Sequence, residues 1–125
     1  MTSSSFIPAA RIRLKQAYDR PDRSDGRRIL VDRLWPRGIS KSDAQLHDWL
    51  RDAAPSKALR QWFNHAPNRW TEFRRRYAAE LRERPEALRH LRGLARRGVI
   101  TLVYAAHDSR YNNAVALRGF VLGRT

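Results

Sequence analysis

The sequence predicts one small α/β domain with a short, mainly parallel sheet of three strands and about five flanking helices. Two observations lead to this fold class. The first is a pair of largely apolar runs, residues 29–31 and 99–106, which are typical of strands covered on both faces. The second is a series of intervening segments whose apolar residues recur at helical spacing. The 125 residues suffice for a single domain, and we expect residues 1–10 to be a disordered N-terminus ahead of a domain spanning residues 11–125.

The strands are predicted from two different patterns. From residue 11 to residue 17, apolar Ile12 and Leu14 alternate with basic side chains, which is typical of a half-exposed strand. A polar loop follows and ends at Asp25 and Gly26, a pair that favours a turn. The two continuous apolar runs supply the second and third strands, and the third should lie at the centre of the sheet.

The helices that follow the second strand are predicted from their caps. Ser42 stands three residues before Gln45, which matches a capping box at a helix start, and Pro55 should end this helix. Ser56 is the predicted N-cap of a short second helix. Each helix has an apolar stripe, formed by Leu46, Trp49 and Leu50 in the first and by Leu59, Trp62 and Phe63 in the second.

Two prolines mark the next helix starts. Pro67 and Pro85 suit the first turn of a third and a fourth helix, because that position has no intrahelical use for an amide hydrogen. Gly98 is predicted to cap the fourth helix in the left-handed conformation. Residues 112–122 should form the last helix. The third helix should bury one face, made of Trp70, Phe73, Tyr77 and Leu81.

The charge balance favours a polyanionic partner. The chain has 26 Lys and Arg residues against 12 Asp and Glu, a formal charge of +14 and a pI near 11.6. Basic domains of this kind accumulate phosphate backbones through counterion release, so nucleic acid is the leading candidate. A GC-rich genome is the alternative source of the arginines, since only three of the basic residues are lysine. Codon bias exchanges lysine for arginine but explains a surplus of positive charge less well.

Several classes of function are excluded or disfavoured. The chain has no cysteine, which excludes disulfides, thiolate metal sites and a cysteine nucleophile. No segment is apolar for the roughly 20 residues of a membrane helix, and the first residues do not resemble a signal peptide. The common nucleotide-binding and serine-hydrolase motifs are missing. We therefore expect a cytoplasmic protein with no membrane partner, no metal site and no cofactor.

The candidate site consists of two loops that follow predicted strands, residues 32–41 and 106–113. Loops at the carboxyl ends of parallel strands emerge on one edge of a sheet, which is where ligands bind in open α/β folds. The first loop carries Arg33, Arg37 and Lys41, whose cationic groups suit phosphate or carboxylate recognition. The alternative is an exposed basic loop without a preferred ligand.

Two carboxylates are the candidate catalytic groups. Asp32 and Asp108 are each expected to orient the arginines or to handle a proton. The structural alternatives are an ion-pair network for Asp32 and, for Asp108 or Ser109, the N-cap of the last helix. Asn112 follows in the same loop and is a candidate ligand contact.

Trp35 and His65 complete the predicted ligand-binding residues. Trp35 can stack on a base or ring, although a Trp-Pro pair is more often a packing plug. His65 can act as a base only if another group orients it, and an ordinary turn histidine is the commoner case. With no HExxH motif and no cysteine partner, the histidines give little support to a metal site.

Several motifs together resemble a known family. They are LVDRLWPRG at residues 30–38 with Lys41, APS at 54–56, LRxWFxH at 59–65, RYxxEL at 76–81, and TLVYAAxD with NNA within 101–114. From Ile12 onward the chain resembles the YeaO-like family, a domain of unknown function numbered 488. The resemblance implies a small cytoplasmic bacterial-type α/β protein. The family's activity is not established, but links between related domains and DNA processing have been suggested.

Three functional hypotheses follow. The first is a protein that binds, or processes, an anionic ligand such as nucleic acid through the basic loop. The second is an enzyme acting on a phosphorylated or carboxylated metabolite in the same cleft. The third is an oligomerising scaffold whose aromatic side chains form a protein interface. The sequence leaves the oligomeric state open.

Overall fold

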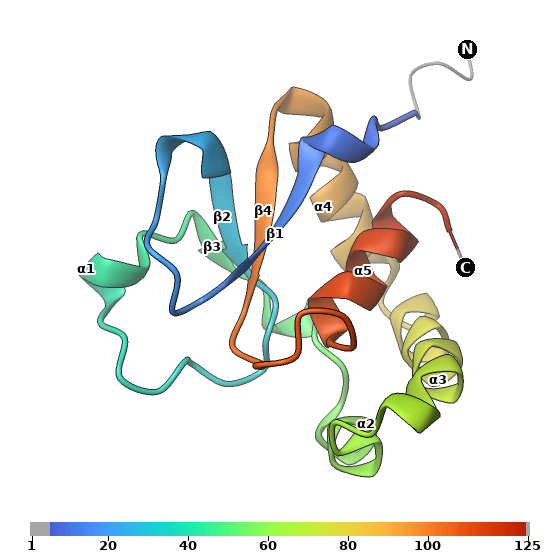
Figure 1. Cartoon of the computed structure of the whole chain (residues 1–125). Helices are drawn as coiled ribbons and strands as arrows, with labels where there is room; N and C mark the ends of the chain where they lie inside the picture. The colour runs from blue at the N-terminus through green and yellow to red at the C-terminus, as the bar shows by residue number, and fades with distance from the viewer. Residues whose placement is uncertain (1–5, 125) are drawn as a thin grey trace.

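A computed structural model describes residues 6–124 as an α/β fold built on a parallel sheet. Every neighbouring pair of strands is parallel, and the order across the sheet is β1-β4-β2-β3. The strands are β1 (Ile12–Gln16), β2 (Arg27–Leu30), β3 (Asp48–Trp49) and β4 (Ile100–Tyr104). The helices of the described chain are α1 (Lys41–Ala44), α2 (Lys57–Phe63), α3 (Trp70–Arg82), α4 (Pro85–Arg97) and α5 (Asn113–Val121) (Figure 1). The fold class and the central strand β4 are as predicted.

The prediction of only three strands is wrong, because β3 lies where a helix was expected. Helix α1 starts earlier than predicted, since Ser40 rather than Ser42 is its N-cap. The helix lasts one turn and ends at Gln45, whose φ of 48° is left-handed. The chain then extends beside β2, where His47 N–H donates to the carbonyl of Arg28 and Leu50 N–H to that of Leu30.

The four larger helices lie on one side of the sheet, as the ribbon shows (Figure 1). Their apolar faces meet the sheet face formed by Ile12, Ile29, Ile100 and Leu102. The predicted stripe of α3 is buried at Phe73, Tyr77 and Leu81, while Trp70 is half-buried. The Tyr77 hydroxyl donates to the carbonyl of Ala53, which fixes the segment between β3 and α2 on this side.

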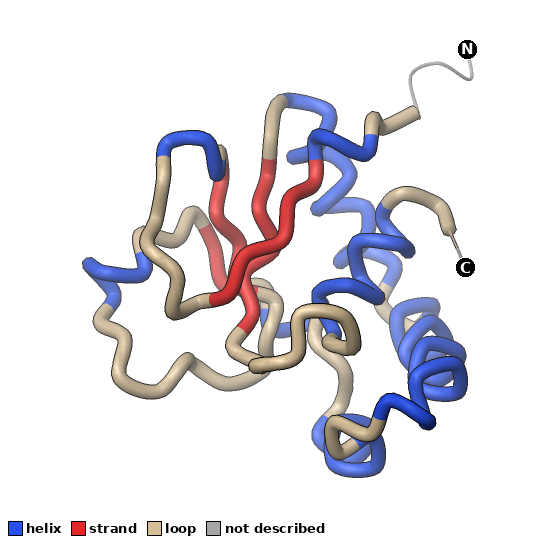
Figure 2. Tube along the Cα trace, viewed as in Figure 1, coloured by secondary structure: helices blue, strands red, loops and turns tan. Residues whose placement is uncertain are grey.

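Loops cover the other face of the sheet. Leu30 and Val103 are buried there under Trp35 and Ile39 from the loop after β2, and under Trp49. The tube view shows how long this loop is, running from the end of β2 around to α1 (Figure 2). The residues after β2 are therefore part of the packing of the sheet.

The helix ends confirm some predicted caps and correct others. The Ser56 hydroxyl accepts from Leu59 N–H and caps α2, and Pro85 occupies the first turn of α4. Pro67 opens a short 3-10 turn, Pro67–Arg69, that leads into α3. Gly98 was predicted to be left-handed but has φ 170°, an extended conformation, because the chain passes almost directly from α4 into β4.

The start of the chain is partly described. The predicted disordered N-terminus covers residues 1–10, of which 1–5 lie outside the described residues. Within the remainder, Ile7 is buried and a 3-10 turn spans Ala9–Arg11. The Arg118 guanidinium donates to the carbonyls of Ala9 and Ile12, which fastens this turn to α5.

Across residues 6–124, no helix combines the length and the apolar character that crossing a bilayer requires.

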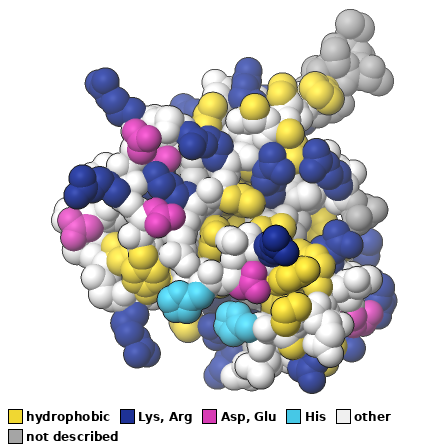
Figure 3. Space-filling view, in the orientation of Figure 1, with side chains coloured by type: hydrophobic (Ala, Val, Ile, Leu, Met, Phe, Trp, Pro, Cys, Tyr) yellow, Lys and Arg dark blue, Asp and Glu magenta, His cyan; other side chains and the backbone are white. Residues whose placement is uncertain are grey.

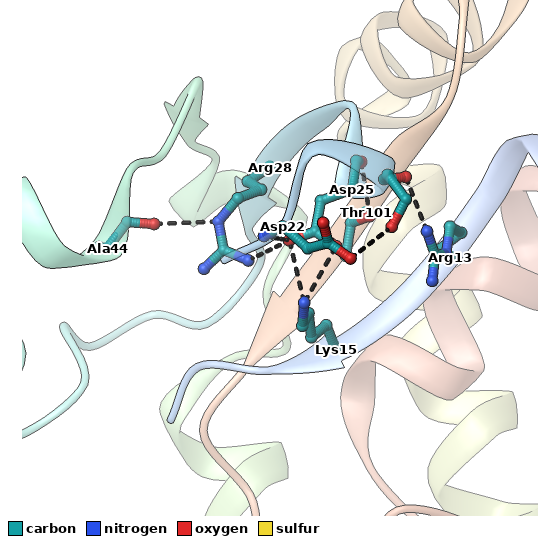
Figure 4. A network of polar contacts seen from close by, with 8 residues as sticks. Arg13, Lys15, Asp22, Asp25, Arg28, Ala44 and Thr101 are labelled. Carbon is teal, nitrogen blue, oxygen red and sulfur yellow. Dashed lines mark hydrogen bonds and ion pairs between the residues drawn. The ribbon is translucent and has the colours of Figure 1, made fainter. Parts of the chain in front are cut away.

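A buried ionic cluster closes the turn before β2 (Figure 4). The Asp25 carboxylate is fully buried and accepts from Arg28 Nη1 at 2.8 Å and from Lys15 Nζ at 3.1 Å. It also accepts from the Asp22 N–H at 3.0 Å. Burial acts to raise the pKa of Asp25, but these hydrogen bonds outweigh it and hold the pKa below the ordinary value. The Thr101 hydroxyl donates to the Asp25 carbonyl, so the cluster joins β1, β2 and β4.

Candidate functional site: the strand-end cavity

The two predicted loops meet at the carboxyl ends of β2 and β4. The Asp32 carboxylate accepts from the N–H of Ala105, just after β4, at 2.9 Å. Its other oxygen accepts from Asn113 Nδ2 at 3.0 Å, and the same amide donates to the carbonyl of Val31. Asp32 thus ties the end of β2 to the end of β4 and to the first turn of α5.

Beside this tie lies a cavity of about 500 Å³, which we call the strand-end cavity. Its walls come from three segments, residues 32–37, 54–65 and 105–113, with Phe73 of α3 behind them. Six of the predicted site residues line it, namely Asp32, Arg33, Trp35, Arg37, His65 and Asn112. Lys41 and Asp108 are outside the lining.

Three arginines contribute positive charge to the cavity. Arg33 is half-buried and donates from Nε to the carbonyl of Pro55 at 3.3 Å. Arg37 and Arg60 are exposed. Arg60, on α2, was not predicted as a site residue, because the sequence does not show that α2 folds back beside the two loops. The available signal was its position in the LRxWFxH motif at residues 59–65.

Asp108 and Asn112 form hydrogen bonds within their own loop. One Asp108 oxygen accepts from the N–H groups of Arg110 at 2.8 Å and Tyr111 at 3.0 Å, and these bonds hold the pKa of Asp108 below its ordinary value. Asn112, rather than Asp108 or Ser109, is the N-cap of α5, since its side-chain oxygen accepts from Val115 N–H. Both side chains therefore give the loop its shape.

Trp35 is a packing residue that also forms part of the cavity wall. Its Nε1 donates to the carbonyl of Ile39 at 2.6 Å. Its ring meets that of Trp49 edge-on, with centroids 5.3 Å apart. The side chain is half-buried, and its neighbours hold the ring in one orientation at the cavity wall.

His65 reaches the cavity because α2 ends abruptly. Asn64 and His65 have φ values of 47° and 54°, two successive left-handed residues that turn the chain back toward the loops. His65 is exposed, and a positive charge on its ring would further lower the pKa of Asp108. The histidine predicted from the sequence is thus a turn residue placed at the cavity.

We expect the carboxyl group of Asp32 to titrate above pH 3.8 in the folded protein. Burial is the largest influence and raises its pKa, although hydrogen bonds from Asn113 and Ala105 and the charge of Arg60 oppose the rise. Between 3.8 and the raised pKa the folded state binds more protons than the unfolded state, so this group's contribution to stability falls as pH rises through that window. Carbon-13 NMR of the side-chain carboxyl groups measures the pKa directly. Asp108 is the internal control, and Asp32 titrating as low as Asp108 would contradict the prediction.

Comparison with known proteins defines the family. The family model described as "Inactive DUF488-N3 subclade" matches residues 11–125. The chain belongs to the DUF488 family. Among DUF488 relatives, the Mycobacterium tuberculosis protein named Uncharacterized protein Rv3073c is 43% identical over 119 residues, which cover 95% of this chain and 100% of the relative. The Escherichia coli K12 protein named Uncharacterized protein YeaO is 41% identical over 106 residues, covering 85% of this chain and 92% of YeaO. No solved structure matches the chain.

These relatives confirm the YeaO-like DUF488 resemblance seen in the sequence motifs. The matched range contains both loops of the strand-end cavity and the whole sheet of this DUF488 protein. The names of these two relatives state no ligand and no reaction.

Proposed function

We propose that this DUF488 protein binds single-stranded nucleic acid at the strand-end cavity without acting on it chemically. The observation that carries the proposal is the meeting of two strand-end loops and α2 around one concave space with Arg33, Arg37 and Arg60 in its lining. Arginine recognises phosphate through paired hydrogen bonds, and a volume of about 500 Å³ lies within the range of small-ligand pockets.

The walls divide into an apolar part and a cationic part. Phe63 and Phe73 are buried at the back of the cavity, while Pro36 and Tyr111 also line it. The half-buried ring of Tyr111 suits the face of a base or a sugar, and the buried phenylalanines close the space behind it. Arg37 and Arg60 are exposed and line the same cavity, so both are accessible to the phosphates of a bound strand. A single strand fits this division, because its bases are free to leave the stack.

The charge of the whole molecule supports a polyanion over a small anion. The formal charge is +14, and Lys and Arg side chains are spread over the face seen in Figure 3 and outnumber the Asp and Glu side chains among them. Such a field raises the local concentration of nucleic acid before any specific contact forms. The cavity arginines would then hold one part of the strand.

Binding without catalysis is better supported than the metabolite-enzyme alternative. Both Asp32 oxygens accept hydrogen bonds from within the protein, and Asp108 accepts from its own loop. The matching family model is also described as inactive. The scaffold alternative gains no support from Trp35 and Trp49, since these two rings pack against each other.

The test is a salt titration of binding to a fluorescently labelled single-stranded oligonucleotide, followed by anisotropy. We expect affinity to fall steeply with salt, and the Arg37→Gln and Arg60→Gln changes each to lower the salt slope by about 0.7. No binding at about 50 mM salt would overturn the proposal.

The matched control is Arg20→Gln with Arg97→Gln. Both residues are exposed and lie outside the cavity lining, so this pair removes the same charge as Arg37→Gln with Arg60→Gln. We expect the cavity pair to weaken binding about tenfold more than the control pair. Equal losses of affinity in the two pairs would show that nucleic acid is attracted by the net charge of the protein and does not bind at the cavity.

A further inference from the structure

A second hollow lies among the helices, and its lining shares no residue with the strand-end cavity. It has a volume of about 620 Å³ and is formed by the end of α3, one face of α4, and the end of α5 with the chain just after it. These three helices lie together on the same side of the sheet (Figure 1). We call it the arginine hollow, after the five arginines in its lining: Arg82, Arg89, Arg92, Arg96 and Arg124.

The arginines form a basic rim without acidic partners. Arg89, Arg92 and Arg96 follow one another at helical spacing on one face of α4. Within the part of the chain that the structure describes, none of the five makes an ion pair, and the lining contains no Asp or Glu. Arg92 donates to the carbonyls of Phe120 and Val121 at the end of α5, which fixes one wall.

The floor between the arginines is apolar. Leu81 and Phe120 are buried there, and Ala78 and Leu88 are half-buried. A phosphate backbone needs cations but no apolar floor. Stacked bases need an exposed aromatic face, and Phe120, the one aromatic residue of the lining, is only 7% exposed. The combination of floor and rim instead suits a group that is apolar at its centre and anionic around it.

We propose that the arginine hollow binds an acidic peptide segment of a partner protein. An apolar side chain of the segment rests on the floor beside Leu88, and flanking carboxylates pair with Arg82 and Arg89. Charge complementarity selects this occupant, because arginine forks match carboxylates. A second copy of this chain does not fit, since it carries the same charge of +14 and would be repelled.

The test uses a short fluorescein-labelled peptide rich in glutamate, with two leucines one helical turn apart. Arg82→Gln with Arg89→Gln is expected to weaken its binding about tenfold, because two charge-assisted contacts are lost. Both residues are exposed, so the fold should be kept, and thermal unfolding of each variant checks this. The matched control, Arg20→Gln with Arg97→Gln, removes equal charge outside the hollow and is expected to change binding by less than about twofold.

Two further probes are used. The first measures what the apolar floor contributes to binding apart from the arginines, and the second distinguishes peptide binding from nucleic-acid binding. A peptide with serine in place of both leucines keeps the charge and is expected to bind about tenfold more weakly. A labelled single-stranded oligonucleotide is expected to bind the Arg82→Gln with Arg89→Gln variant no more weakly than the control variant. Equal peptide affinity for the two variants would overturn the proposal. The proposal would also fail if Arg82→Gln with Arg89→Gln weakened binding of the oligonucleotide but not of the peptide. The hollow would then be part of a surface that binds nucleic acid.

Discussion

Gly26→Ala is expected to destabilise the fold by about 3–5 kcal/mol, through strain and a steric clash together. Gly26 has φ 62° and ψ −136°, a conformation that L side chains rarely adopt. A Cβ there would lie 2.1 Å from the carbonyl oxygen of Val99 and 2.8 Å from its carbonyl carbon. That oxygen accepts from Arg27 N–H at the start of β2, so moving it away breaks the first contact between β2 and β4. Urea unfolding followed by circular dichroism measures the loss.

Gly38→Ala is the matched control for this experiment. Gly38 also has a positive φ, 83°, but no atom lies within 4 Å of the position its Cβ would take. Its substitution should therefore cost only the conformational strain, about 1–2 kcal/mol. If the two variants were equally stable, the close approach of Gly26 to Val99 would be irrelevant to folding.

The single substitution Asp25→Ala is also expected to have a large effect and to lower the free energy of unfolding by about 3–5 kcal/mol. The change leaves Arg28, which is 4% exposed, without its carboxylate partner, and it also removes the acceptor of Lys15 and of the Asp22 N–H. A buried charge without a partner is what makes such substitutions costly. Chemical denaturation at neutral pH measures the effect.

The double variant Asp25→Ala with Arg28→Met tests the cause. Removing both charges should restore part of the stability lost in Asp25→Ala, because no unpaired guanidinium stays buried. A double variant less stable than Asp25→Ala would show that Arg28 is held by its bond to Ala44 rather than by charge pairing.

The same cluster makes stability depend on pH. Since the pKa of Asp25 is lowered on folding, the contribution of Asp25 to the free energy of unfolding is present above pH 3.8 and is lost as the pH falls through the folded-state pKa.

The sequence was sufficient to predict the sheet centre and most helices because those elements carry local signals. Continuous apolar runs mark β2 and β4, and Ser56 and Pro85 sit at helix starts in the structure as predicted. Strand β3 had no such signal. The spacing of Leu46, Trp49 and Leu50 satisfies a helix as well as the observed loop and strand, and the packing of Trp49 on Trp35 is a tertiary contact.

The meeting of the two strand-end loops was predictable, and the details of the candidate site were less so. Parallel strands bring their ends to one edge, which is why the loops after β2 and β4 could be placed together from sequence. The orientation of Asp108 toward its own backbone depends on the conformation of one short loop, which composition does not determine. The position of Arg60 at the cavity depends on how α2 folds back. Contacts such as the hydrogen bonds of Ser56 with Glu80 on α3 hold α2 in that place.

The loop that carries Arg33 and Arg37 also covers one face of the sheet, and this has a consequence for recognition. Trp35 and Ile39 cannot leave Leu30 and Val103 without exposing apolar surface to water. The loop is therefore ordered by the packing of the sheet itself, and the nucleic-acid binding proposed above would cost this loop little conformational entropy. Preorganisation of this kind would make even a few cationic contacts effective.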